Sequence, residues 1–130
     1  MIKSDELRLW NFVFDKEQNK IDIIDVIEEN RVSLLYSKFP YTPINLIQPV
    51  ELTPDILEAA GFDSENYMFI KDVFDSRIAI CYDYGDRQCG VGFSQRHMFW
   101  TNCKYLHQLQ NLLYCLTGDE LQIDITKLNK

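Results

Sequence analysis

Short apolar runs separated by polar turns characterise the first third of the chain. Residues 7–14, 21–27 and 32–36 place apolar side chains mostly two or four positions apart, which is typical of half-buried strands. The middle run also fits a helix through its isoleucines, but the spacing of two favours a strand. Because the connecting turns are short and polar, we predict an antiparallel meander.

The next segment, residues 37–52, follows neither a helical nor a strand period. It contains Pro40, Pro43 and Pro49, with apolar residues between them. Proline restricts the backbone and removes a hydrogen-bond donor, whereas the apolar side chains favour burial. We therefore predict an irregular loop that packs on the rest of the protein.

Residues 53–60 carry the start and stop signals of a short helix. Thr53 suits the N-cap and Pro54 the first helical position, where a missing N–H group is tolerated. Gly61 suits the position after the C-cap, which favours a positive φ.

Extended segments dominate the second half. Turn residues 84–87 include Gly85, which tolerates a positive φ, so we predict a hairpin in which Cys81 and Cys89 can face each other. Gly90 and Gly92 leave one face of a strand bare, where we expect a helix or another backbone to pack closely. Residues 67–74 are expected to be extended, and strands are predicted over residues 77–83, 88–93, 98–101 and 121–125.

A longer helix is predicted over residues 103–117. Asn102 is the candidate N-cap, and Gly118 marks the end. Apolar side chains recur at three- and four-residue spacing and form a stripe wide enough to lie on a sheet. These are Tyr105, Leu106, Leu109, Leu112, Leu113 and Leu116.

Together, these elements predict an α+β fold. We expect one domain, residues 1–130, with an antiparallel sheet of six or seven strands. One short helix (53–60) and one C-terminal amphipathic helix (about 103–117) are expected to pack on the sheet. A chain of 130 residues is long enough to bury a core without metal or disulfide support.

The other side of the C-terminal helix carries the polar stripe, defined here as His107, Gln110, Asn111 and Tyr114. A solvated helix usually presents Lys and Glu, so uncharged amides and an imidazole are unusual there. The stripe has two interpretations. It is either a binding face for a protein or small ligand, or a surface that packs against the proline-rich loop with satisfied hydrogen bonds.

Charge and hydropathy limit the classes of function. The formal net charge is −7, with acids in excess over residues 1–30 and 51–75, which argues against general binding of duplex nucleic acid. No apolar run approaches the roughly 20 residues of a membrane span. The polar N-terminal residues lack a secretory pattern, and the four cysteines form no Cys-x-x-Cys pair. We therefore expect a cytoplasmic protein with reduced thiols.

Candidate chemistry is sparse. Cys103, near a helix start, and His107 form a possible but poorly defined nucleophile–base pair. The histidines and cysteines lack a metal-ligand spacing, and no phosphate-loop motif is present. Arg87 and Arg96, with Trp100 nearby, form a locally basic aromatic region that suits a nucleotide or a single strand. We expect no enzymatic activity, metal or cofactor.

Three segments resemble a family of small, uncharacterised proteins of bacteriophages, prophages and related mobile elements of gut bacteria. They are residues 41–46 (YTPINL), 52–62 (LTPDILEAAGF) and 105–121 (YLHQLQNLLYCLTGDEL). The first third of this chain departs from the family by being longer and more acidic. The resemblance implies a phage or mobile-element context, and it supplies no activity, catalytic residue or cofactor.

These observations favour a non-enzymatic interaction protein of the bacterial cytoplasm. Its partner would be a host or phage protein, bound through the polar stripe together with Trp100 and Arg96. The first alternative is a small-molecule or nucleotide-binding protein that acts as a sponge in counter-defence. The second alternative is a minor component of the virion.

Overall fold

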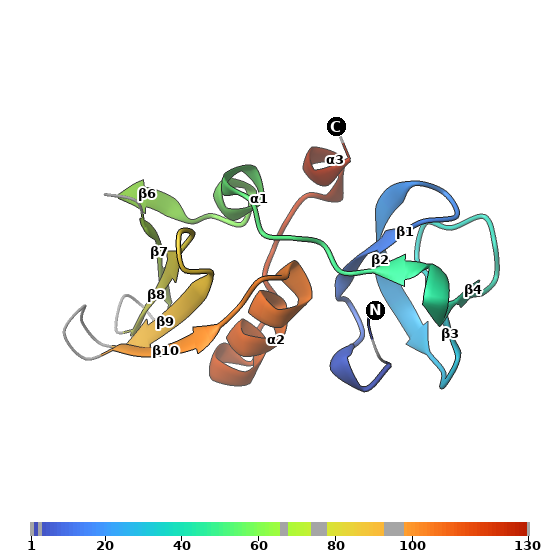
Figure 1. The fold of residues 1–130 in the computed structure, drawn as a ribbon, viewed down its shortest axis with the longest axis horizontal. Coiled ribbons are helices and arrows are strands. Elements are labelled where there is room, and N and C mark those ends of the chain that lie inside the picture. Colours follow the sequence, from blue (N-terminus) through green and yellow to red (C-terminus); the bar gives the residue numbers. More distant parts are fainter. Residues whose placement is uncertain (1, 3, 66–67, 74–77, 93–97, 130) are drawn as a thin grey trace.

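Two antiparallel five-stranded sheets flank a central helix in the computed structural model (Figure 1), which describes residues 2, 4–65, 68–73, 78–92 and 98–129. The first sheet has the order β4-β3-β2-β1-β5 and the second β10-β9-β8-β7-β6. The predicted α+β class is confirmed. The predicted number of six or seven strands is wrong, because ten strands are present in the described residues.

The first sheet consists of β1 (Phe12–Asp15), β2 (Lys20–Ile27), β3 (Arg31–Leu34), β4 (Thr42–Pro43) and β5 (Ile47–Gln48). The second consists of β6 (Asp63–Glu65), β7 (Met68–Val73), β8 (Ile78–Asp83), β9 (Gln88–Gly92) and β10 (Met98–Asn102). The helices are the 3-10 turns η1 (Ser4–Glu6) and η2 (Ile44–Leu46), and α1 (Pro54–Ala59), α2 (Leu106–Thr117) and α3 (Ile125–Leu128).

The predicted meander is present as β1, β2 and β3, paired antiparallel in sequence order. β1 begins at Phe12 rather than at residue 7, because residues 8–11 form a turn. The proline-rich segment contains β4, η2 and β5. Its strands have two residues each, too few for an alternating pattern to identify them.

The short helix α1 begins and ends as predicted. The Thr53 side chain accepts a hydrogen bond from the Ile56 N–H group at 3.3 Å, and Pro54 is the first helical residue. Gly61 follows the C-cap with φ 89°. The signals for this helix are local, which explains why sequence alone identified it.

The β8–β9 hairpin is confirmed, with Asp83 opposite Gln88. The positive φ lies at Arg87 (55°) and not at Gly85. Cys81 pairs with Gly90, one position away from Cys89, so the two cysteines point to opposite faces instead of facing each other.

The bare sheet face at Gly90 receives a side chain rather than a helix or another backbone. Trp100 is its partner on β10, and a Cβ atom at Gly90 would lie 2.9 Å from the Trp100 ring. Glycine is therefore required at position 90 by the indole that lies over it.

Helix α2 ends as predicted at Gly118, which has φ 76° and donates its N–H to the Tyr114 carbonyl at 2.8 Å. The predicted N-cap is wrong. Asn102 belongs to β10, and Tyr105 is the N-cap residue. The Gln108 side chain accepts from the N–H groups of Lys104 and Tyr105 at 2.9 and 3.2 Å. Backbone pairing continues past β10, between Cys103 and Arg87 and between Tyr105 and Glu51. The helix therefore starts later in the sequence than predicted.

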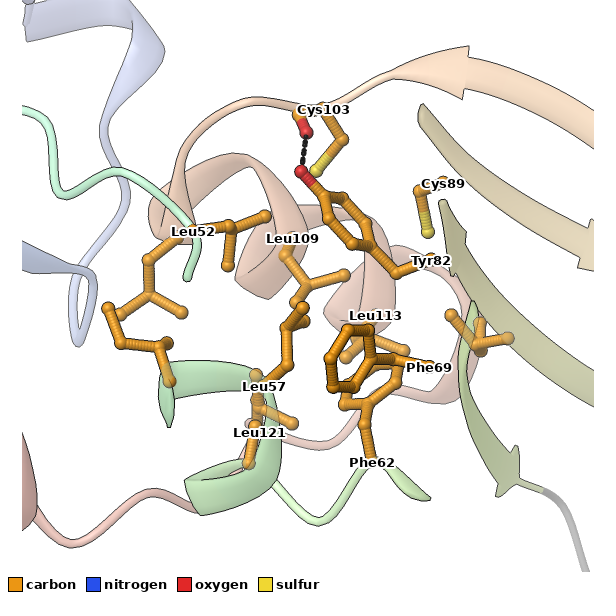
Figure 2. Packing of buried hydrophobic residues seen from close by; sticks show 14 of the residues in the cluster. Leu52, Leu57, Phe62, Phe69, Tyr82, Cys89, Cys103, Leu109, Leu113 and Leu121 are labelled. Carbon is orange, nitrogen blue, oxygen red and sulfur yellow. Dashed lines mark hydrogen bonds between the residues drawn. The ribbon is translucent and has the colours of Figure 1, made fainter. Parts of the chain in front are cut away.

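The main hydrophobic core lies between the sheets and around α2 (Figure 1). Leu109 and Leu113 of α2 meet Leu57 of α1 and aromatic residues of the second sheet (Figure 2). The Tyr82 hydroxyl donates to the Cys103 carbonyl at 2.7 Å, so the buried ring keeps a hydrogen bond. A second cluster covers the opposite face of the first sheet and includes Ile2 and Leu7 from the N-terminal segment.

The C-terminal residues return to the first sheet. Residues 121–125 were predicted as a strand, but 121–124 belong to no strand or helix and α3 starts at Ile125. Residues 126–130 were expected to fray. Instead, the Asn129 side chain accepts from the Ile21 N–H at 2.7 Å and donates to the Ile21 carbonyl at 2.8 Å. The Asn129 side chain thus forms hydrogen bonds with the two backbone groups of Ile21 to which a neighbouring strand would otherwise bond.

Candidate functional site

The structure separates the residues predicted for binding. His107 and Gln110 are each only 1% exposed, and Asn111 is partly buried. Tyr114 and Trp100 are both 41% exposed, but Trp100 lies on β10. Arg96 lies outside the described residues. The polar stripe therefore does not form one exposed face, and it packs against the N-terminal segment rather than the proline-rich loop.

Gln110 joins α2 to the start of β1. Its side-chain oxygen accepts from the Phe12 N–H at 2.9 Å, and its nitrogen donates to the Trp10 carbonyl at 3.1 Å. A single buried amide thus satisfies one donor and one acceptor on the edge of this segment that faces away from β2, where β5 pairs only with Phe14 and Asp15.

Asn111 extends this connection one position along the helix. Its oxygen accepts from Asn11 Nδ2 at 2.8 Å and from Arg8 Nε at 3.1 Å. Its nitrogen donates to the Glu6 carbonyl at 3.3 Å. Since Asn11 is fully buried, these bonds fix residues 6–11 against α2.

Arg8 completes the arrangement at the surface. Its guanidinium forms two hydrogen bonds with the Glu120 carboxylate, one of them from Nη2 to Oε2 at 3.0 Å. It also lies 4.1 Å from the centroid of the Tyr114 ring. Paired, stacked Arg side chains lose little further freedom on contact with a partner.

The segment held in this way is a tight turn with an unusual conformation. The Asn11 N–H donates to the Arg8 carbonyl at 3.1 Å, and the Arg8 N–H donates to Asn11 Oδ1 at 2.8 Å. Trp10, inside the turn, has φ 76°. This left-handed conformation costs a residue with a bulky side chain roughly 1–2 kcal/mol.

The turn displays large apolar side chains. Leu9 is 46% exposed and Trp10 is 50% exposed, and Tyr114 lies beside Arg8. We define the Trp10 site as Arg8, Leu9, Trp10 and Tyr114. A hollow of about 240 Å³ adjoins it. The hollow is lined by Trp10, Phe12, Ile23, Glu120, Leu121, Gln122 and Ile123.

Sequence reasoning found Tyr114 but missed Arg8, Leu9 and Trp10. These three were assigned to a strand because they start an apolar–polar alternation. The turn depends on contacts with residues about 100 positions away, which periodicity does not reveal. Asn11, a residue common in turns, was the one local signal.

His107 has a different role from the other members of the polar stripe. Its ring stacks on Tyr105, with centroids 6.0 Å apart and planes at 10°. In the described part of the chain, neither ring nitrogen has a hydrogen-bond partner. Burial lowers the pKa of His107 from its usual 6.5, and the smaller influence of Glu6 raises it. The folded protein therefore favours the neutral ring.

The lowered pKa of His107 predicts an acid-dependent loss of stability. Below pH 6.5 the unfolded chain binds a proton at His107 more readily than the folded chain does. The contribution of the neutral ring to stability is present above pH 6.5 and decreases as the pH falls below it, by at most about 1 kcal/mol between pH 7 and pH 5.5. Urea unfolding at both pH values, for wild type and His107→Phe, measures the effect. Carboxylate titration is common to both proteins, so equal pH dependence in the two would contradict this role of His107.

Cys103 and Arg87 both have roles within the fold. Cys103 is 2% exposed, and burial raises its pKa to about 12, the opposite of what a nucleophilic thiol requires. Arg87 donates to the Leu52 carbonyl at 2.9 Å and lies over the Tyr84 ring at 4.4 Å.

Within residues 2, 4–65, 68–73, 78–92 and 98–129, no group of three or more His, Cys, Asp or Glu side chains is placed to hold a metal ion. None of the helices described there is long and apolar enough to cross a membrane. Comparisons with protein-family models, curated proteins and solved structures found no match.

Proposed function

We propose that this protein is a non-enzymatic protein-binding domain that uses the Trp10 site as its contact surface. The observation that carries the proposal is the exposed Trp10 side chain on a turn whose backbone is held in a left-handed conformation. Backbone strain of this kind persists only where surrounding contacts enforce it, and it concentrates at functional positions.

The composition of the site supports a protein partner. Trp, Tyr and Arg are the residue types that most often carry the binding energy of protein interfaces. Here Arg8, Trp10 and Tyr114 lie together, and hydrogen bonds to α2 hold the turn before any partner arrives. Prior ordering reduces the entropy lost on binding.

The surrounding charges indicate the kind of partner. Asp5 and Glu6 of η1 are exposed, as is Asp119, and Glu120 already pairs with Arg8. A surface with an apolar centre and a basic rim would therefore fit this site. The resemblance to phage and mobile-element proteins makes a host or phage protein of the bacterial cytoplasm the partner that we propose.

Binding of a nucleotide is the second candidate, because the Trp10 indole offers a stacking surface. The hollow beside it favours this function less. Its volume of about 240 Å³ is below the roughly 300–1,000 Å³ of typical ligand pockets. Its described lining includes Glu120, which already pairs with Arg8, and no Lys, Arg or His that would bind phosphate. A thermal shift with a nucleotide panel tests this candidate, and a shift retained by Trp10→Gly would exclude the Trp10 surface as the site.

Trp10→Gly is expected to abolish capture of the partner without unfolding the protein. Glycine adopts φ 76° without strain, so the turn is retained while the indole is lost. Loss of a central interface tryptophan typically costs about 2 kcal/mol or more, a weakening of about 30-fold. Tagged wild type and variant are incubated with bacterial lysate, with and without phage infection, and bound proteins are quantified by mass spectrometry.

Tyr36→Ala is the matched control, because Tyr36 is an aromatic residue that is 57% exposed at another surface. A protein captured by wild type and Tyr36→Ala but lost from Trp10→Gly supports the proposal. Equal capture by Trp10→Gly, or no protein enriched by wild type, contradicts it. Circular dichroism of all three proteins confirms that the fold is unchanged.

A further inference from the structure

The edges of the two sheets, as far as the structure describes them, differ in what prevents further strand pairing. β4 and β5 have two residues each, with Pro43 in the first and Pro49 directly after the second. β6 carries Asp63 and Glu65. Short length, proline and charge all keep a sheet edge from pairing with another chain. β10 has five residues, MFWTN, with neither charge nor proline.

β10 is also the edge with the most exposed apolar surface. Phe99 is 85% exposed and Trp100 is 41% exposed, and Thr101 and Asn102 are exposed as well. Trp100 lies over Gly90 on the face of the sheet, so its indole is held in place and leaves the edge accessible. An uncharged aromatic edge strand of this length is suited to pairing with another strand.

The hydrogen-bond pattern shows which backbone groups of β10 point away from the sheet. The Cys103 N–H donates to the Arg87 carbonyl at 2.9 Å, in register with the β9–β10 pairs. Because antiparallel partners alternate, Phe99 and Thr101 direct their backbone groups toward β9. The N–H and C=O groups of Trp100 and Asn102 therefore point outward.

We propose that β10 pairs antiparallel with β10 of a second copy of this chain, across a two-fold axis at Trp100. The two second sheets would then form one continuous sheet of ten strands. The outward N–H and C=O groups of Trp100 would bond to those of its counterpart, within a set of up to about six backbone hydrogen bonds. This surface is separate from the Trp10 site, and the proposal does not depend on the proposed function.

The sequence of β10 is compatible with itself in this register. Phe99 would lie opposite Thr101 of the second copy, and Trp100 opposite Trp100. Aromatic and β-branched pairs of this kind stabilise neighbouring strands. No like charges would face each other along β10, although each chain carries a net charge of −7. This self-complementarity favours a second copy over an unrelated strand.

Sedimentation velocity over about 1–300 µM at 0.15 M salt tests the proposal. A contact made mainly by one strand pair falls below the roughly 1,200 Å² of a standard interface. We therefore expect a concentration-dependent dimer of wild type rather than a permanent one. Asn102→Pro removes an outward N–H group and the side-chain bond from Gln88 Nε2 at 3.4 Å, but no backbone bond to β9. It should weaken the dimer at least 10-fold.

Asn102→Thr is the matched control, because it retains the N–H group and should dimerise like wild type. A wild-type protein that remains monomeric throughout, or an Asn102→Pro variant that dimerises equally well, overturns the proposal. If near-UV circular dichroism shows that Asn102→Pro disturbs the sheet, Asn102→Lys replaces it. A lysine on this edge should block pairing by charge, and unchanged dimerisation of that variant is equally decisive against the proposal.

Discussion

The Leu113→Asp variant is expected not to fold. Leu113 is 3% exposed and lies in the core between the sheets. Loss of the buried leucine removes about 1.5–3 kcal/mol of apolar stabilisation, and an unpaired carboxylate in the same place costs several kcal/mol more. The sum is comparable to the whole stability of a domain this size, about 5–15 kcal/mol. Thermal unfolding followed by circular dichroism, together with limited proteolysis, measures the result.

Cys115→Asp provides the control for Leu113→Asp. Cys115 lies two positions further along α2 and is exposed, so the new carboxylate remains hydrated. Near a helix C-terminus it should cost no more than about 1 kcal/mol. If Leu113→Asp melted as a cooperative unit near the wild-type temperature, the assignment of this side of α2 to the core would be wrong.

The Gln110→Leu variant is expected to lose about 2–4 kcal/mol of unfolding free energy. Leucine fills a similar volume, but it leaves the Phe12 N–H and the Trp10 carbonyl without their bonds to Gln110. An unsatisfied buried group such as the Phe12 N–H costs about 1–3 kcal/mol, and the partly buried Trp10 carbonyl adds less. Urea unfolding measures the loss, and hydrogen exchange should locate its largest local effect at residues 8–12.

Two further variants serve as comparisons for Gln110→Leu. Gln110→Glu keeps an acceptor for Phe12 but loses the donor to Trp10 and buries a carboxylate, so it should be destabilised as well. Gln122→Leu changes the same residue type at an exposed position and should alter stability by less than about 0.5 kcal/mol. Unchanged exchange at residues 8–12 in Gln110→Leu would show that α2 does not hold the turn.

Elements with local signals were predictable from the sequence. Thr53, Pro54 and Gly61 define α1, and Gly118 defines the end of α2, because caps and left-handed positions depend on neighbouring residues. The start of α2 was not predictable in this way. Asn102 has the chemistry of an N-cap, but strand pairing with β9 takes precedence.

The candidate site shows the same limit. The amides of α2 were correctly singled out as unusual for a solvated surface, yet their partners were not foreseeable. Gln110 and Asn111 bond to residues about 100 positions earlier in the chain. The left-handed Trp10 follows from those distant contacts, and no sequence period encodes it. The two amides of the polar stripe, Gln110 and Asn111, thus marked specific contacts, and those contacts are intramolecular.

The hydrogen bonds between Asn129 and Ile21 have a consequence for the order of synthesis. The ribosome synthesises the chain from the N-terminus to the C-terminus. β1 and β2 are therefore made about 100 residues before the α2 and α3 groups that complete their contacts. Until then, Phe12 lacks the α2 leucines with which it shares a core in the finished protein. The first sheet is therefore made before the second sheet but completed after it, and a nascent chain must keep it from pairing wrongly in the meantime.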